Sequence, residues 1–154
     1  MNVLMVTIPL RPNPNKNRPL GPLCIKKYME KQGFEGVIEL YDIDLFRPSF
    51  DEVVSHIIDK KPDILGLSAI VSTSYEYTKM LSIEVRKALP DCMIVLGGNM
   101  GASAEIILKK TEVDIVVLDD GEIPFNEICT RAKTTRNVEE YYDIGGLVFL
   151  NKDQ

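Results

Sequence analysis

Small and polar residues stand at the ends of three apolar runs in the middle of the chain. Ser68 ends the first run and precedes the loop Ser72–Ser74, Gly97 and Gly98 end the second, and the segment Asp119–Glu122 follows the third. Hydroxyl and carboxylate groups can hydrogen-bond a ligand, and paired glycines let a ligand approach the backbone closely. We therefore expect the three ends to form one site for a large ligand.

Groups that would support covalent or metal chemistry are sparse. His56 is the one histidine, and it lies between core positions of an amphipathic run rather than at a strand end. Cys24, Cys92 and Cys129 are far apart and odd in number, which is typical of reduced thiols in a cytosolic protein. The sequence shows no nucleophile–base pair and no metal-type spacing of Cys or His. We expect a binding function without catalytic or metal-ligating side chains.

Composition indicates an ordinary globular domain. The 154 residues suggest one domain, of which 45% are hydrophobic and 27% charged. The net charge of −5 argues against a nucleic-acid partner, because phosphate binding requires clustered Lys and Arg. No apolar run approaches the ~20 residues of a membrane span, and the apolar start has no basic leader. We expect a cytoplasmic protein without a membrane partner.

Strands and helices alternate along the chain. Helical stripes follow each of five apolar runs, with Ser49 or Asp51 expected to cap the second helix and Thr73 or Ser74 the third. A last strand is expected to start near Leu147. The fold class is therefore α/β: a single doubly wound, flavodoxin-like or Rossmann-like, five-stranded parallel sheet with helices on both faces. The five runs that predict its strands are Asn2–Ile8, Val37–Ile43, Asp63–Ala69, Met93–Gly97 and Asp114–Leu118.

The expected strand order, 2-1-3-4-5, places a ligand outside the carboxyl ends of the first and third strands. The segment Pro9–Pro22 contains five prolines and three asparagines, so we expect a long irregular loop after the first strand. In this arrangement the proline-rich loop faces the loop Ser72–Ser74 across the crevice.

Several common functions of this fold do not match the strand ends. A phosphoacceptor receiver needs an acidic pair after the first strand and an Asp at the end of the third, where this chain has Pro9-Leu10-Arg11 and Ala69-Ile70-Val71. A flavin mononucleotide site needs a compact Ser/Thr/Gly loop after the first strand. The glycine motifs of dinucleotide and P-loop sites are also missing. Phosphoryl transfer, flavin and dinucleotide binding are thus disfavoured.

Motifs along nearly the whole chain resemble the cobalamin-binding domain that precedes the radical S-adenosylmethionine (SAM) domain in a large enzyme family. That family includes methyltransferases and the anaerobic magnesium-protoporphyrin ester cyclases. The matching stretches are PLGPLCIKKYMEKQGFE, PDILGLSAIVSTSYE, IVLGGNMGASAE, DIVVLDDGEIPFNEI and IGGLVFLN. The Gly-Gly after the fourth strand and the Gly-Glu-x-x-x-Phe after the fifth are the usual anchors of the family.

The resemblance implies a site for cobalamin, with the nucleotide tail threaded between the sheet and its helices. Ser68 would approach the dimethylbenzimidazole, Gly97 and Gly98 would let the tail pass the backbone, and the exit of the proline-rich loop would lie under the corrin ring. The ten implied cofactor-binding residues are Leu20, Gly21, Ser68, Thr73, Ser74, Gly97, Gly98, Met100, Gly121 and Glu122.

The chain also departs from its relatives. The Asp-x-His-x-x-Gly loop of other cobalamin proteins is absent, so the resemblance implies a base-off corrinoid without a histidine ligand. The usual Gly-Glu-Gly-Glu reads Asp119-Asp120-Gly121-Glu122 here. No Cys-x-x-x-Cys-x-x-Cys motif occurs, so SAM and an iron–sulfur cluster would belong to a C-terminal radical SAM domain outside this chain.

Two functional hypotheses follow from these observations, and a third, an independent small enzyme, is disfavoured because no nucleophile–base pair is visible. The first is a non-catalytic cobalamin-binding module of an enzyme that performs methyl transfer or related radical chemistry on an unknown substrate. In it, residues 1–142 form the cobalamin-binding-like domain, and residues 143–154 start a linker or strand towards the radical SAM domain. The second, motivated by the acids Asp119 and Asp120, is a cofactor-free interaction or regulatory domain of the same fold.

Overall fold

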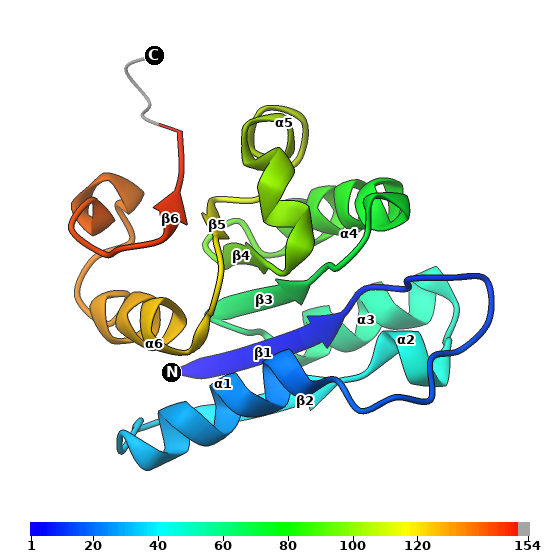
Figure 1. The fold of residues 1–154 in the computed structure, drawn as a ribbon, viewed down its shortest axis with the longest axis horizontal. Helices are drawn as coiled ribbons and strands as arrows, with labels where there is room; N and C mark the ends of the chain where they lie inside the picture. Colours follow the sequence, from blue (N-terminus) through cyan, green and yellow to red (C-terminus); the bar gives the residue numbers. More distant parts are fainter. Residues whose placement is uncertain (151–154) are drawn as a thin grey trace.

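A computed structural model describes residues 1–150 and contains one six-stranded sheet in the order β2-β1-β3-β4-β5-β6 (Figure 1). Strands β1 to β5 are parallel, and β6 pairs antiparallel with β5. The predicted α/β fold and its order 2-1-3-4-5 are confirmed, with β6 added at the edge. The strands are β1 (Asn2–Thr7), β2 (Val37–Tyr41), β3 (Ile64–Ser68), β4 (Met93–Gly97), β5 (Ile115–Val117) and β6 (Leu147–Val148).

Helices cover both faces of the sheet. The helix α1 packs beside α6 on one face, whereas α3, α4 and α5 cover the other (Figure 1). Side chains of a strand alternate between its two faces, so Val3 and Met5 pack under α1 and α6 while Leu4 and Val6 pack under α3 and α4. The helices are α1 (Leu20–Lys31), α2 (Ile43–Phe46), α3 (Phe50–Lys60), α4 (Tyr75–Ala88), α5 (Ala104–Lys110) and α6 (Glu122–Arg131), with 3₁₀ turns η1 (Ser72–Ser74), η2 (Asn99–Ser103) and η3 (Val138–Tyr141).

Local capping explains where two of the elements begin. Ser49 caps α3 as predicted, in a reciprocal arrangement in which Ser49 Oγ accepts from the Glu52 N–H at 3.3 Å and Glu52 Oε2 accepts from the Ser49 N–H at 2.8 Å. The second strand ends two residues earlier than predicted, because Asp42 caps α2 by accepting from the Leu45 N–H at 3.1 Å. The helix α2 was not predicted from the sequence.

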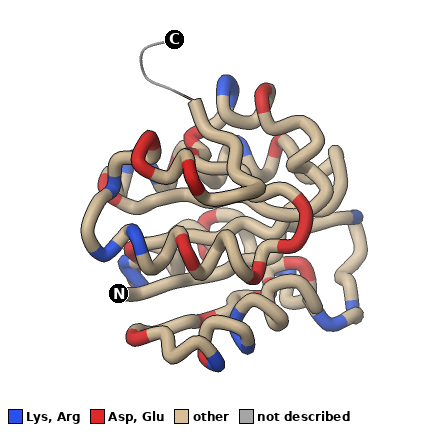
Figure 2. Tube along the Cα trace, turned by 60° about the vertical axis from the view of Figure 1, so that its left-hand side comes forward, with Lys and Arg blue, Asp and Glu red and all other residues tan. Residues whose placement is uncertain are grey.

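The remaining expectations concern the surface and the end of the chain. Acidic and basic residues are interspersed over the molecule (Figure 2). Within residues 1–150, no helix has the length and apolar character to cross a membrane. Strand β6 falls in the segment expected to start a linker, of which residues 151–154 lie outside the described residues.

Candidate functional site

A cavity of about 540 Å³ opens at the carboxyl edge of the sheet. Its walls come from the ends of β1, β3, β4 and β5, the proline-rich loop, the first turns of α1 and the start of α6. This is the edge at which doubly wound sheets bind ligands, and the volume lies in the range of cofactor sites. The three strand ends singled out in the sequence therefore do meet in one cavity.

A row of paired residues forms the strand-end part of the cavity. Thr7 pairs with Ser68, and Ser68 pairs with Gly97, so all three lie side by side on the face covered by α1 and α6. The Thr7 hydroxyl is already engaged, because it donates to Asp42 Oδ1 at 2.6 Å and accepts from the Asp44 N–H at 3.1 Å. The Ser68 hydroxyl has no hydrogen-bond partner among the described residues, so it is free to bond a ligand.

Behind this row the cavity reaches an apolar floor. Met5, Gly66 and Val95 lie opposite one another on β1, β3 and β4, two residues before Thr7, Ser68 and Gly97. Phe125 of α6 also lines this part of the cavity. A Cβ on Gly66 would lie 3.2 Å from both Met5 Cγ and Phe125 Cζ, so the floor has no room for a side chain there. The glycine thus lets Met5 and Phe125 pack closely over β3, and these two side chains form the surface of the floor.

Gly97 and Gly98 serve different purposes. A Cβ on Gly97 would meet no atom within 4 Å, because this position opens onto the cavity. Gly98 has φ 98°, and a Cβ there would lie only 2.5 Å from the carbonyl oxygen of Ala69. Gly98 is required by the turn itself, whereas Gly97 leaves space for a ligand.

The proline-rich loop forms one wall of the cavity and is held by the buried carboxylate of Asp44. Asp44 Oδ1 accepts from the Leu10 N–H at 3.0 Å and from Arg47 Nη2 at 2.5 Å. The Asp44 carbonyl oxygen accepts from the Asn15 N–H at 3.1 Å, and Arg47 Nη2 also donates to the Asn13 carbonyl oxygen at 2.9 Å. The short helix α2 therefore fixes the loop in place.

The same loop is held from the other side by two hydroxyl groups. Thr73 Oγ1 donates to the carbonyl oxygen of Leu10 at 3.1 Å, and Ser74 Oγ donates to that of Pro9 at 3.0 Å. Ser74 occupies the N-cap position of α4, one of the two positions predicted, but its side chain makes no capping hydrogen bond to that helix. Their hydroxyls instead satisfy carbonyl groups of the loop across the crevice.

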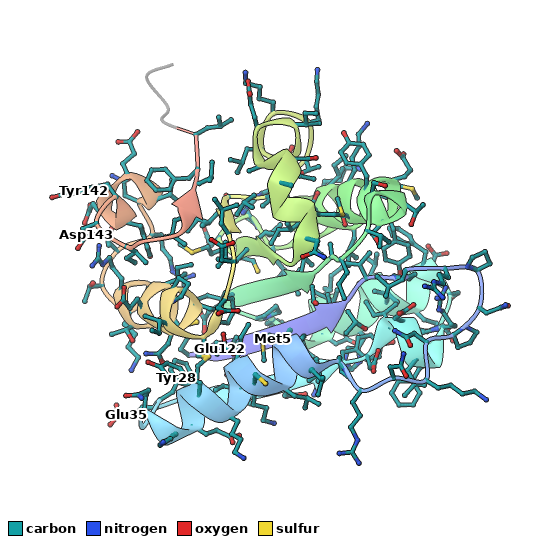
Figure 3. The ribbon with its side chains drawn as sticks, in the orientation of Figure 1. Met5, Tyr28, Glu35, Glu122, Tyr142 and Asp143 are labelled. Carbon is teal, nitrogen blue, oxygen red and sulfur yellow. The ribbon has the colours of Figure 1, made fainter. Side chains whose placement is uncertain are left out.

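The connection between β5 and α6 supplies the acidic wall. Asp119, at φ 55°, and Asp120 line the cavity together with Glu122, and their carboxylates make no hydrogen bond or ion pair within residues 1–150. Glu122 at the start of α6 and Met5 on β1 both lie beside α1 (Figure 3). A Cβ on Gly121 would lie 3.1 Å from Ile25 Cδ1 of α1, so this glycine allows close packing of α1 and α6.

Seven of the ten predicted residues line the cavity: Leu20, Gly21, Ser68, Gly97, Gly98, Gly121 and Glu122. Thr73 and Ser74 hold the proline-rich loop instead, and Met100 is buried in the core under α4 and α5. Sequence reasoning missed the deeper layer of the floor. The two-residue period of a strand was the available signal, because Gly66 and Val95 precede Ser68 and Gly97 by two positions. Nothing in the local sequence pointed to Asp44.

Comparisons with known proteins agree with this geometry. The B12 binding domain family matches residues 12–129. The chain is 27% identical over 128 residues to the anaerobic magnesium-protoporphyrin IX monomethyl ester cyclase of Rubrivivax gelatinosus, a match that covers 82% of this chain and 23% of that protein. The chain thus spans about a quarter of the length of this curated relative.

Solved structures share the fold. The radical SAM methyltransferase TsrM from Kitasatospora setae, with tryptophan and a SAM analogue bound, matches with a TM-score of 0.78 at 17% identity, over 99% of this chain and 29% of that one. The cobalamin-dependent radical SAM enzyme OxsB, with aqua-cobalamin bound, matches with a TM-score of 0.72 at 16% identity, over 98% and 21%. From the family match over residues 12–129, we conclude that the chain belongs to the B12-binding domain family.

Proposed function

We propose that this chain is a cobalamin-binding module that serves a radical SAM enzyme. The observation that carries the proposal is the depth of the cavity, which leads from a polar mouth at the sheet edge to an apolar floor around Gly66. A corrinoid has the matching shape, with a broad polar ring and a narrow nucleotide tail that ends in an aromatic base. Family membership and the cavity support the same ligand independently.

The floor suits the base of the tail. Met5, Val95 and Phe125 line the floor and offer apolar contact to a planar ring. The free Ser68 hydroxyl can donate a hydrogen bond to a ring nitrogen at the strand-end layer. In this proposal Leu20 and Gly21 contact the tail or the ring where the proline-rich loop ends.

The mouth suits the corrin ring, whose periphery carries many amide groups. Asn15, Asn17 and Asn99 line the mouth and can both donate to and accept from amides. Asp119 and Glu122 can accept from amide N–H groups. Bound cobalamin would supply a cobalt centre that carries a methyl group or changes oxidation state, while these residues bind and orient it.

The cobalt would have no histidine ligand from this chain. His56 lies on α3, on the face of the sheet away from the cavity, where its ring packs 4.3 Å from that of Tyr41. We therefore propose a base-off corrinoid whose nucleotide base lies in the floor of the cavity. Reduced to Co(II), such a complex has an electron paramagnetic resonance spectrum without nitrogen superhyperfine splitting. Splitting from a nitrogen ligand would refute the base-off assignment.

The chemistry would be completed by a C-terminal radical SAM domain that supplies SAM and an iron–sulfur cluster. The chain covers 23% of the cyclase it matches, which leaves room for such a domain in a longer protein. The reaction would be methyl transfer or related radical chemistry on an unknown substrate. We propose a cytoplasmic location, because three widely spaced cysteines are typical of reduced thiols in a cytosolic protein.

A cofactor-free interaction domain is the competing candidate, and the unpaired carboxylates of Asp119 and Asp120 favour it. Titration with hydroxocobalamin separates the two. We expect a shifted visible spectrum and comigration of protein and corrinoid on gel filtration. An unchanged spectrum without comigration at high cofactor concentration would reject cobalamin binding and leave the interaction domain as the better description.

A further inference from the structure

The charged side chains that line the cavity are unequally divided. Five carboxylates line it, whereas a single cation does so within the described part of the chain: Asp42, Asp44, Asp119, Asp120 and Glu122 against Arg18. Two of the acids are already engaged in holding the proline-rich loop and α2. An anionic ligand group would therefore meet like charge at five of the six charged positions of the wall and opposite charge at one.

Arg18 is available for such a group. Its side chain is exposed on the proline-rich loop, and its guanidinium makes no hydrogen bond or ion pair with any residue from 1 to 150. Pro19 follows directly and restricts the backbone at this position. Lys16 and Arg11 lie on the same loop and are exposed, but neither lines the cavity. Arg18 is thus distinguished from its neighbours by position and not by charge.

The ligand of the proposed function carries one obligatory anion outside the corrin ring, the phosphodiester of its nucleotide tail. A guanidinium presents a planar fork of N–H donors that matches two phosphate oxygens. We propose that Arg18 binds this phosphodiester and makes the cavity selective for complete corrinoids over forms that lack the nucleotide tail. This inference rests on the proposed cobalamin binding and adds the residue that distinguishes the tail.

The test compares two corrinoids on the 154-residue chain. Hydroxocobalamin has the phosphodiester and the base, whereas hydroxocobinamide lacks both. We expect Arg18→Ala to weaken hydroxocobalamin binding about tenfold, which corresponds to about 1.4 kcal/mol, and to leave the Kd of hydroxocobinamide unchanged. Arg18→Lys should lose less, because it keeps the charge but not the fork. Lys16→Ala is the matched control, a loop cation outside the cavity, and should change neither Kd.

The salt dependence of hydroxocobalamin affinity is a second measurement. It would not change if Arg18 had only a structural role. Because the contact pairs opposite charges near solvent, hydroxocobalamin affinity of the unsubstituted chain should fall with ionic strength more steeply than that of Arg18→Ala. Thermal unfolding of Arg18→Ala and Arg18→Lys should match the parent, since Arg18 makes no hydrogen bond or ion pair within residues 1–150.

Three results would overturn the assignment. If Arg18→Ala weakens both corrinoids equally, Arg18 acts on the ring or on the loop and not on the tail. If it weakens neither, the phosphodiester is bound elsewhere, and only the role of Arg18 fails. If the unsubstituted chain binds neither corrinoid, the proposed function fails and this inference fails with it.

Discussion

Removing the charge of Asp44 tests whether the proline-rich loop is a preformed wall of the binding cavity. The side chain of Asp44 is 4% exposed and that of its partner Arg47 is 22% exposed, so the pair is largely shielded from water. Breaking a buried pair by removing one partner costs about 3–5 kcal/mol. Because the Arg47 guanidinium keeps some contact with water, we expect Asp44→Ala to lower the free energy of unfolding by about 2–3 kcal/mol.

Asp44→Asn is the sharper variant because it nearly preserves shape. Its amide oxygen can still accept from the Leu10 N–H, while the charge opposite Arg47 is lost. We expect a loss of about 1.5–2 kcal/mol, the lower part of the range for a hydrogen bond to a charged group. Suppose that the full ~2 kcal/mol destabilises the position of the loop that binds the ligand. The apparent Kd for hydroxocobalamin would then rise about thirtyfold, which is an upper limit.

The assay pairs urea unfolding with hydroxocobalamin titration. Asp59→Asn is the matched control, because Asp59 is exposed on α3 and makes no hydrogen bond or ion pair with the described residues. Its unfolding midpoint and Kd should equal those of the parent. The reasoning is refuted if Asp44→Asn unfolds like the control. If stability falls but the Kd does not change, the loop is held by Asp44 without forming part of the binding wall.

Three further outcomes follow from the packing. Gly97→Val should keep the parent stability, since Gly97 faces open space, yet weaken hydroxocobalamin about tenfold, whereas Gly98→Ala should cost about 2 kcal/mol in urea unfolding because of its φ of 98°. A thiol reagent should label exposed Cys24 in the native protein and the buried Cys92 and Cys129 only after unfolding; three labelled thiols in the native state would contradict the burial. Burial raises the pKa of both buried thiols from 9.0 to about 12, so their neutral forms are favoured by folding. Their contribution to stability should be complete below about pH 8.5 and be lost as pH rises towards 12, which urea unfolding at pH 8 and pH 11 would detect, and a flat profile would refute.

The sheet could be predicted because its strands are buried on both faces. A parallel strand between two helical layers appears as an unbroken apolar run, and the run Asp63–Ala69 contains the observed strand Ile64–Ser68 within one residue at each end. The antiparallel pairing of β6 was less accessible. Leu147–Val148 is only two residues long, so no period could show its direction.

The holding of the proline-rich loop could not be predicted, because its bonds join residues far apart in the chain. Asp44 bonds Leu10 across 34 positions, and α2, which carries it, is four residues long and has no helical period. Ser74 bonds Pro9 across 65 positions, whereas its local sequence is equally typical of a helix cap. A local sequence pattern can predict only hydrogen-bond partners that are close in the chain. The side-chain role of a residue whose partner is distant is therefore predicted wrongly.

The proline-rich loop is held by two separate groups of hydrogen bonds, and this limits how far it can loosen when the Asp44 carboxylate is lost. Leu10 donates its N–H to Asp44 on one side and accepts from Thr73 through its carbonyl on the other. Prolines have no N–H to donate, so the proline-rich loop forms no regular element in which the Pro9 carbonyl could find a nearby backbone partner. The buried Ser74 hydroxyl donates to this carbonyl instead. Because Thr73 and Ser74 lie outside the Asp44 network, they continue to hold the start of the loop when the carboxylate is removed. The loosening should therefore be concentrated around Asn13 and Asn15, which is why thirtyfold is an upper limit and not the expected value.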